Sequence, residues 1–212
     1  MRALLIALLS VVATHAVLAD PLSREQALKA LSKDEAPLRR EAASRLGEVG
    51  TMADMNVLVR TLRDPDDETR DRAEQAMWGI WARSGDAAID ALYQTGIEQM
   101  NAGELQQAIA TFTRIIERKP DFAEGWNKRA TLYYLVGDMR KSLADCDEVI
   151  KRNPYHFGAL SGYMLIYVHL EYYDRALEYS RKALEINPNL QNVRENMELL
   201  ERLLKERKSR TV

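Results

Sequence analysis

Between residues 91 and 190, apolar side chains recur every three or four positions, the spacing of helices that bury one face. Pro120, Pro154 and Pro188 follow three of these stretches and lie 34 residues apart. Proline lacks a backbone donor and disfavours helical angles in the residue before it, so each proline marks a helix end. No segment alternates β-branched and polar residues as a strand would. The pattern predicts an all-α fold with a 34-residue repeat.

Each 34-residue unit reads as two helices joined by a short turn. A small residue stands twelve positions before each proline: Ala108, Ser142 and Ala176. The middle unit resembles the signature of the tetratricopeptide repeat family through Trp126, Ala130, Tyr133, Gly137 and Pro154. The outer units depart from that signature at Gln99, where an aromatic is usual, and at Glu171, which replaces the turn glycine. The resemblance implies a right-handed α-solenoid of helix-turn-helix repeats, with three units over residues 87–190.

Residues 20–86 carry a second, shorter repeat. Its positions recur at an offset of 31 residues: Arg39, Ala42, Leu46 and Val49 become Arg70, Ala73, Met77 and Ile80. With the turn at Asp64 and Asp66, this pattern resembles HEAT-like helical repeats, in which an arginine of one unit pairs with the aspartate turn of a neighbour. Trp78 and Trp81 share a helix face, and we expect them to pack the junction with the first 34-residue unit; a ligand stack is the alternative. A break is expected at residues 84–86.

The chain begins with a pattern typical of a secretory leader. Arg2 precedes an apolar run, and small residues stand at Val17 and Ala19, the two positions that a signal peptidase reads. A membrane anchor is the alternative, but the uninterrupted run is shorter than the ~20 residues that span a bilayer. We therefore predict a signal peptide over residues 1–19 and a soluble protein of the periplasm, without stable membrane insertion once the leader is removed.

The last segment, residues 191–212, predicts a capping helix. Val193, Met197, Leu200 and Leu204 recur at helical spacing, as a terminal repeat requires to cover its open face.

The whole chain has 30 Lys and Arg against 32 Asp and Glu, a net charge of −2. Because no basic patch stands out, a nucleic-acid partner is not expected.

The sequence offers no catalytic or cofactor-binding motif. Cys146 is the single cysteine, so no intramolecular disulfide is possible, and we expect it to be a buried apolar residue rather than a reactive thiol. His156 and His169 lie at opposite ends of one predicted helix, ~20 Å apart, too far to share a metal. We expect no metal, no cofactor and no enzymatic activity.

The family resemblance implies that a partner binds in the concave groove formed by the first helix of each unit. Aromatic rings there would bury large areas, and amides would bond a peptide backbone. The predicted groove residues are Tyr93, Ile97, Met100, Asn101, Asn127, Thr131, Tyr134, Leu165 and His169. For Met100, Leu135 and Val168, packing between repeats is an equal alternative.

Related arrays clamp the C-terminal carboxylate of heat-shock chaperones with Lys, Arg and Asn. The corresponding positions here hold Tyr93, Ile97, Lys128, Gly158 and Gly162. This clamp is therefore not expected.

Two classes of function follow. The first is a non-enzymatic adaptor or scaffold that binds a protein or peptide segment of the cell envelope in the groove. The second is a structural subunit of an envelope or secretion assembly, held through the convex face and the HEAT-like end, or an accessory factor to an envelope enzyme such as a protease or cell-wall hydrolase. The fold does not decide between them.

Overall fold

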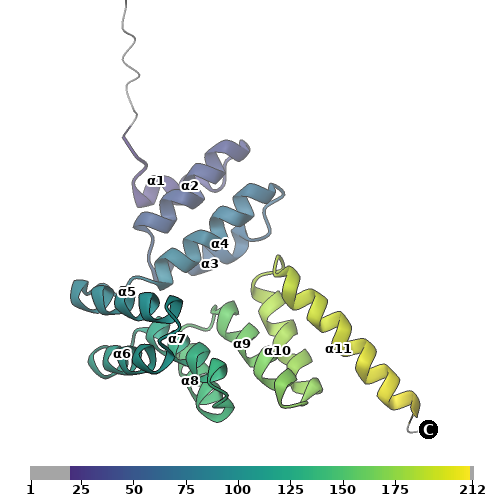
Figure 1. Cartoon of the computed structure of the whole chain (residues 1–212). Helices are drawn as coiled ribbons and strands as arrows, with labels where there is room; N and C mark the ends of the chain where they lie inside the picture. Colours follow the sequence, from purple (N-terminus) through teal and green to yellow (C-terminus); the bar gives the residue numbers. More distant parts are fainter. Residues whose placement is uncertain (1–19, 211–212) are drawn as a thin grey trace, which may run out of the picture.

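The computed structural model describes residues 20–210, and all regular structure in that part of the chain is helical (Figure 1). The all-α expectation is therefore confirmed. The predicted leader, residues 1–19, lies outside the described residues. In chain order the helices are α1 (Arg24–Ala30), α2 (Ala36–Val49), η1 (Met52–Asp54), α3 (Met55–Thr61), α4 (Asp67–Trp81), α5 (Ala87–Asn101), α6 (Leu105–Arg118), α7 (Ala123–Leu135), α8 (Met139–Arg152), α9 (Phe157–His169), α10 (Tyr173–Ile186) and α11 (Gln191–Arg210). None of these helices is both long and apolar enough to span a membrane.

The helices α5 to α10 form three consecutive helical hairpins, as the 34-residue period predicts. Each first helix ends in the same way, with one residue at positive φ: Gly103 at 76°, Gly137 at 83° and Glu171 at 60°. The backbone N–H of this residue and of the next one bond back to carbonyls of the helix, which is the Schellman arrangement. Glycine adopts positive φ without strain, whereas Glu171 has a Cβ that opposes it. The departure from the signature at Glu171 is thus accommodated without a change of turn.

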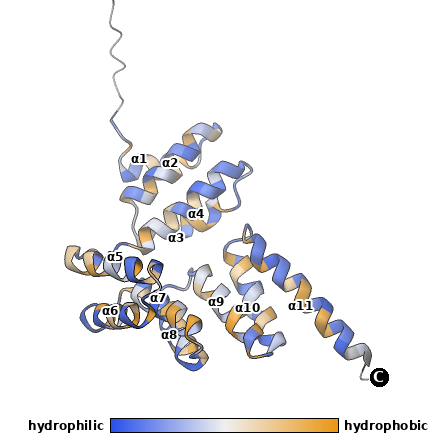
Figure 2. Ribbon diagram, viewed as in Figure 1, coloured by the Kyte–Doolittle hydropathy of each residue, from blue (hydrophilic) through white to orange (hydrophobic). Residues whose placement is uncertain are grey.

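Small side chains lie where paired helices approach closely. Ala108, Ser142 and Ala176 are buried at 0–1% exposure. At Gly96 a Cβ atom would lie 2.6 Å from the ring of Phe112, so only glycine fits there. Figure 2 shows hydrophobic residues along the sides on which helices face one another. The 34-residue period therefore appears in the small residues at helix contacts as well as in the prolines at helix ends.

The N-terminal helices α1 to α4 form a layer around a shared apolar core that includes Leu46, Leu58 and Met77, and arginine–aspartate pairs join α2 to the turn between α3 and α4. The Arg39 guanidinium donates two hydrogen bonds to Asp64, at 2.7 and 2.8 Å, and two more to the main-chain carbonyls of Lys33 and Asp34. Arg40 is paired in the same manner with Asp66. These contacts agree with the expected pairing of an arginine with the aspartate turn, although membership in the HEAT-like class stays a prediction.

The N-terminal layer packs on the third 34-residue unit, and the expectation that Trp78 and Trp81 pack against the first unit is wrong. Trp81 stacks on His156 with ring centroids 4.5 Å apart, and Trp78 meets Phe157 edge-on at 5.3 Å. Further along the edge, α4 and the turn after α3 contact the loop between α10 and α11: Glu74 accepts a hydrogen bond from Asn187 at 2.8 Å, and the Leu62 carbonyl accepts one from Asn189. The superhelical bend brings α4 onto residues far away in the sequence (Figure 1).

The last helix, α11, covers the open side of α10. Val193 and Leu200 are buried, and Met197 and Leu204 are packed against the same cluster as Leu160 and Leu177. The predicted apolar stripe therefore performs the expected packing. Leu199 and Leu203, by contrast, lie on the outer face of α11 and are 49% and 39% exposed.

Candidate functional site

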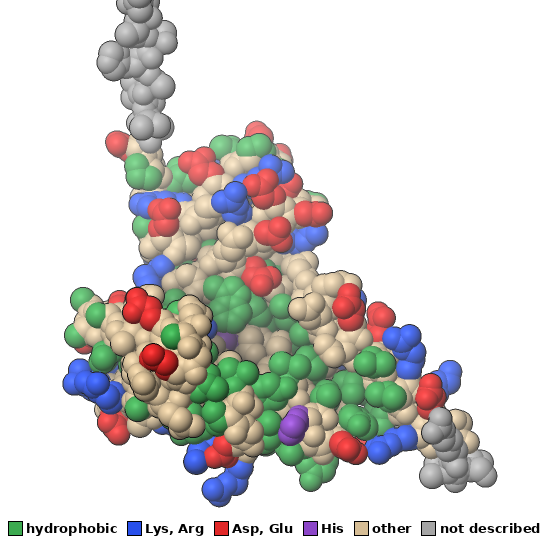
Figure 3. Space-filling model, viewed as in Figure 1, with side chains coloured by type: hydrophobic (Ala, Val, Ile, Leu, Met, Phe, Trp, Pro, Cys, Tyr) green, Lys and Arg blue, Asp and Glu red, His purple; other side chains and the backbone are tan. Residues whose placement is uncertain are grey.

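A cavity of about 160 Å³ lies between α7 and α9, the first helices of the second and third repeats. We call it the α7–α9 groove. Its walls contain small residues that leave room between the helices, together with four of the predicted site residues, Asn127, Thr131, Tyr134 and Leu165. On the face drawn in Figure 3, hydrophobic side chains gather across the middle of the molecule, where the surface is hollowed.

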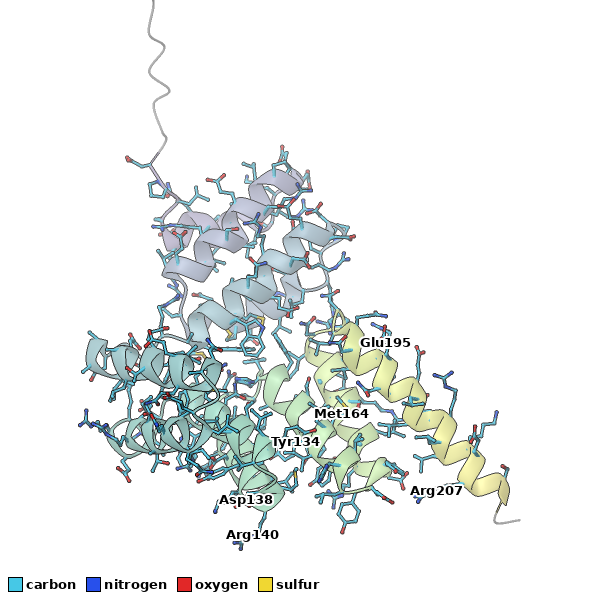
Figure 4. The ribbon with its side chains drawn as sticks, in the orientation of Figure 1. Tyr134, Asp138, Arg140, Met164, Glu195 and Arg207 are labelled. Atoms are coloured by element: carbon cyan, nitrogen blue, oxygen red, sulfur yellow. The ribbon has the colours of Figure 1, made fainter. Side chains whose placement is uncertain are left out.

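The groove side chains differ in how they are held. The Asn127 Nδ2 group donates to both carboxylate oxygens of Glu124, at 3.1 and 3.3 Å, which orients the amide. Tyr134 is half-buried at the side of α7 that faces α9 (Figure 4), and its ring lies 6.5 Å from that of His169. Leu165 is 41% exposed. The groove therefore combines fixed polar groups with an apolar surface open to a partner.

The predicted residues from the first repeat lie elsewhere. Tyr93 is buried at 5% exposure, with its ring edge-on to Phe112 and Phe122, so its side chain belongs to the core rather than to an open surface. Ile97 and Met100 pack against the same cluster, and Asn101 is exposed at the end of α5. Of the two other ambiguous residues, Val168 is partly buried in the cluster of the third repeat, and Leu135 is 55% exposed.

A buried polar network lies next to the groove, and the sequence analysis did not predict it. The Glu124 carboxylate is 1% exposed and lies 2.6 Å from His156 Nε2, 3.3 Å from the Tyr93 hydroxyl and 3.6 Å from Lys128 Nζ. Burial by itself raises the pKa of Glu124, but the hydrogen bond from His156 and the neighbouring charges outweigh it and lower that pKa to about 2. Tyr93 is the one member of this network that the sequence places in the groove, and only the fold shows that its side chain turns inward.

The comparisons with known proteins agree with this architecture. The family model described as "Tetratricopeptide repeat" matches residues 165–190. A TPR repeat-containing protein of Rhizobium etli is 33% identical over 138 residues, which cover 65% of this chain and 67% of that protein. The chain belongs to the tetratricopeptide repeat family. Tetratricopeptide repeat protein 12 of Homo sapiens is 30% identical over 115 residues, covering 51% of this chain but 16% of that protein.

Solved structures of other proteins share the fold. The first TPR of Spaghetti (RPAP3), bound to the HSP90 peptide SRMEEVD, has a TM-score of 0.54 at 19% identity, and the match covers 55% of this chain and 93% of that one. MamA from Desulfovibrio magneticus has a TM-score of 0.52 at 20% identity, over 79% of this chain and 88% of that one. Tetratricopeptide repeat proteins mediate protein–protein interaction. The repeat architecture expected from the sequence is confirmed.

Two features of the described residues bear on the chemistry expected from the sequence. Within residues 20–210, no three His, Cys, Asp or Glu side chains are grouped so that they could hold a metal ion. Cys146 is buried at 2% exposure, as expected, and burial together with the charges of Asp145 and Asp147 raises the pKa of its thiol to about 12. Burial and the raised pKa both disfavour the reactive thiolate form.

Proposed function

We propose that this tetratricopeptide repeat protein is a non-enzymatic adaptor that binds a segment of another protein of the cell envelope in the α7–α9 groove. The observation that carries the proposal is the groove itself: Leu165 and Tyr134 offer apolar area, while Asn127 and Thr131 offer polar groups at fixed positions. Aromatic and amide side chains in a concave surface suit an extended or helical peptide. The leader pattern of the first 19 residues supports export to the periplasm.

This proposal uses five of the nine groove residues predicted from the sequence. Asn127, Thr131, Tyr134, Leu165 and His169 form the proposed contact surface, because they lie in or beside one cavity. Tyr93, Ile97 and Met100 are assigned to support of the first repeat, since their side chains pack in its core. Asn101 is exposed on α5 and would be reached only by a segment longer than the groove.

The test is site-specific photocrosslinking in the source organism. A photoreactive phenylalanine replaces Tyr134 in the full chain, and adducts are identified by mass spectrometry. We expect one discrete protein adduct, which disappears when Leu165→Glu is added. A matched probe replaces Leu199, which is exposed on the outer face of α11, away from the groove. Absence of an adduct at position 134 in a folded, exported protein would reject the groove as the binding site.

A structural role in an envelope or secretion assembly is the second candidate. It is favoured by Leu199 and Leu203, one helical turn apart and both exposed on α11. This function would give a stable adduct from the probe at position 199 and none from position 134. It would also make complex formation insensitive to Leu165→Glu.

A further inference from the structure

A second cavity, of about 190 Å³, lies outside the groove where the α4–α5 connection meets the loops before α7 and α9. Its lining includes Trp81 and Arg83 from the N-terminal layer, Lys119 from the first repeat, and Arg152 and Asn153 from the second. The three segments are distant in the sequence and meet where the N-terminal layer joins the repeats. We call it the junction cavity.

The amide of Asn153 has an unused donor in this place. The residue is 1% exposed, and its Oδ1 atom accepts a hydrogen bond from the backbone N–H of Tyr155 at 3.2 Å. Its Nδ2 group finds no acceptor among residues 20–210. A buried donor that is left unpaired is costly, and native structures rarely leave one without a partner. An acceptor supplied from outside the chain would remove that cost.

The next repeat shows which acceptor suits this position. Asn187 stands 34 residues after Asn153 and is equally buried, and its Oδ1 atom accepts from the backbone N–H of Asn189 at 3.0 Å. Its Nδ2 group donates to a carboxylate oxygen of Glu74, a residue of α4, at 2.8 Å. The asparagine at this position of the third repeat, Asn187, thus binds a carboxylate from another segment of the chain. At Asn153, the equivalent position of the second repeat, the described residues supply no such carboxylate.

The charge around the junction cavity also favours an anion. Arg83 donates to the main-chain carbonyls of Gly47 and Gly50, and no ion pair joins it to a carboxylate of the described residues. Lys119 has only a distant pair, with Asp121 at 3.7 Å, and Asp121 is the one acidic residue in the lining. Arg152 pairs with Glu148 on its own helix. The charge of Arg152 is thus already matched by Glu148. Arg83 and Lys119 bring further positive charge to a partly enclosed space whose lining holds one acid, Asp121, and attraction to an added anion is stronger there than in water.

We propose that the junction cavity binds the carboxylate of an aspartate or glutamate side chain of a partner polypeptide. The Asn153 Nδ2 group donates to one oxygen, in the manner of Asn187 and Glu74, while Lys119 and Arg83 supply the positive charge. The site is separate from the α7–α9 groove and does not depend on a peptide binding there. It lies in the loops between repeats, away from the positions at which related arrays hold a C-terminal carboxylate.

The test is an NMR titration of the ¹⁵N-labelled protein with N-acetyl-glutamate amide and, separately, N-acetyl-glutamine amide. The side-chain NH₂ signals of Asn153 report on the site directly. We expect saturable shifts with the glutamate compound and none with the uncharged glutamine compound. Equal shifts with both compounds, or no shift with either, would overturn the proposal.

Three variants sharpen the result. Asn153→Asp keeps the oxygen that accepts from Tyr155 but removes the donor, and Lys119→Glu reverses a charge on the rim; each should weaken binding at least about tenfold. Lys151→Glu makes the same charge change at an exposed position outside the lining, and should leave binding unchanged. Inorganic phosphate is titrated as the competing anion. If phosphate binds as tightly as the glutamate compound, the site is a general anion site and the assignment to an acidic side chain is wrong.

Discussion

His156 Nε2 lies 2.6 Å from Glu124 Oε1, and both side chains are buried. The other ring nitrogen, Nδ1, accepts a hydrogen bond from the backbone N–H of Ala159 at 3.0 Å and caps α9. This bond assigns the proton to Nε2, which then donates to Glu124. Because Trp81 stacks on the same imidazole, this pair joins the second repeat, the third repeat and the N-terminal layer at one point.

The Glu124 carboxylate should make stability depend on pH in the acid range. Its pKa is lowered from the ordinary 4.5 to about 2 in the folded protein, so the unfolded state binds the proton more readily. The stability that Glu124 contributes is therefore present above about pH 4.5 and is lost as the pH falls towards 2. Urea unfolding at a series of pH values should show this loss.

The variant Glu124→Gln tests whether this carboxylate causes the pH dependence of stability. We expect the variant to be less stable at pH 7 by about 1–3 kcal/mol, because the neutral amide satisfies the surrounding donors less well. Its stability should fall less steeply than that of the unmodified protein between pH 4.5 and 2. Glu98→Gln, at an exposed position of α5, is the control. An unchanged slope in Glu124→Gln would contradict the role assigned to this carboxylate.

Gly158→Ala should loosen the junction between α4 and α9. A Cβ atom at position 158 would lie 2.5 Å from Cη2 of Trp78, too close for either side chain to stay in place. We expect a loss of about 1–3 kcal/mol from overpacking. Hydrogen exchange in α4 should become faster, since α4 is the helix displaced.

Gly162→Ala is the matched control on the same helix. There the added Cβ would meet Cys146 Sγ at 3.7 Å, an ordinary contact. Alanine has the higher helix propensity, so this variant should be as stable as the unmodified protein or more stable by up to about 1 kcal/mol. Equal destabilisation by both substitutions would show that contact with Trp78 is not the cause.

Glu171→Gly should stabilise the third repeat by about 1 kcal/mol, because glycine adopts φ near 60° without the penalty that a Cβ brings. The exposed ion pair of Glu171 with Arg207, at 3.8 Å, would be lost at little cost. Gly137→Ala is the reciprocal change: its φ is 83° and no atom lies near the added Cβ, so only the backbone conformation opposes it. Thermal unfolding should show opposite shifts for the two variants.

Cys146 should resist thiol reagents in the folded protein. Its thiol is buried and its pKa is raised to about 12, so the reactive thiolate is scarce and inaccessible. Reaction with a disulfide reagent such as Ellman's should be slow in native buffer and rapid in denaturant. Fast labelling of the native protein would contradict the burial of this side chain. Ser142→Ala on the same helix, which removes a buried hydrogen bond to the Ala130 carbonyl, should speed labelling if the helix opens locally.

The sequence by itself determined the features that depend on near neighbours. Pro120, Pro154 and Pro188 end helices, the turn residues Gly103 and Gly137 take positive φ, and the apolar stripe of the last helix covers the one before it. Each of these follows from backbone sterics or from the helical period, which operate over a few residues and repeat every 34. That is why the repeat architecture could be read without a structure.

Only the tertiary structure decided which residues meet across repeats. Trp78 packs against α9 rather than α5, Tyr93 turns into the core, Glu124 reaches His156, and Asn153 lines the junction cavity with an unpaired Nδ2 group. These contacts depend on the small rotation between successive repeats, summed over the array. A period in the sequence shows that units stack, but it does not give that rotation, and so it does not show which side chains the curvature brings together.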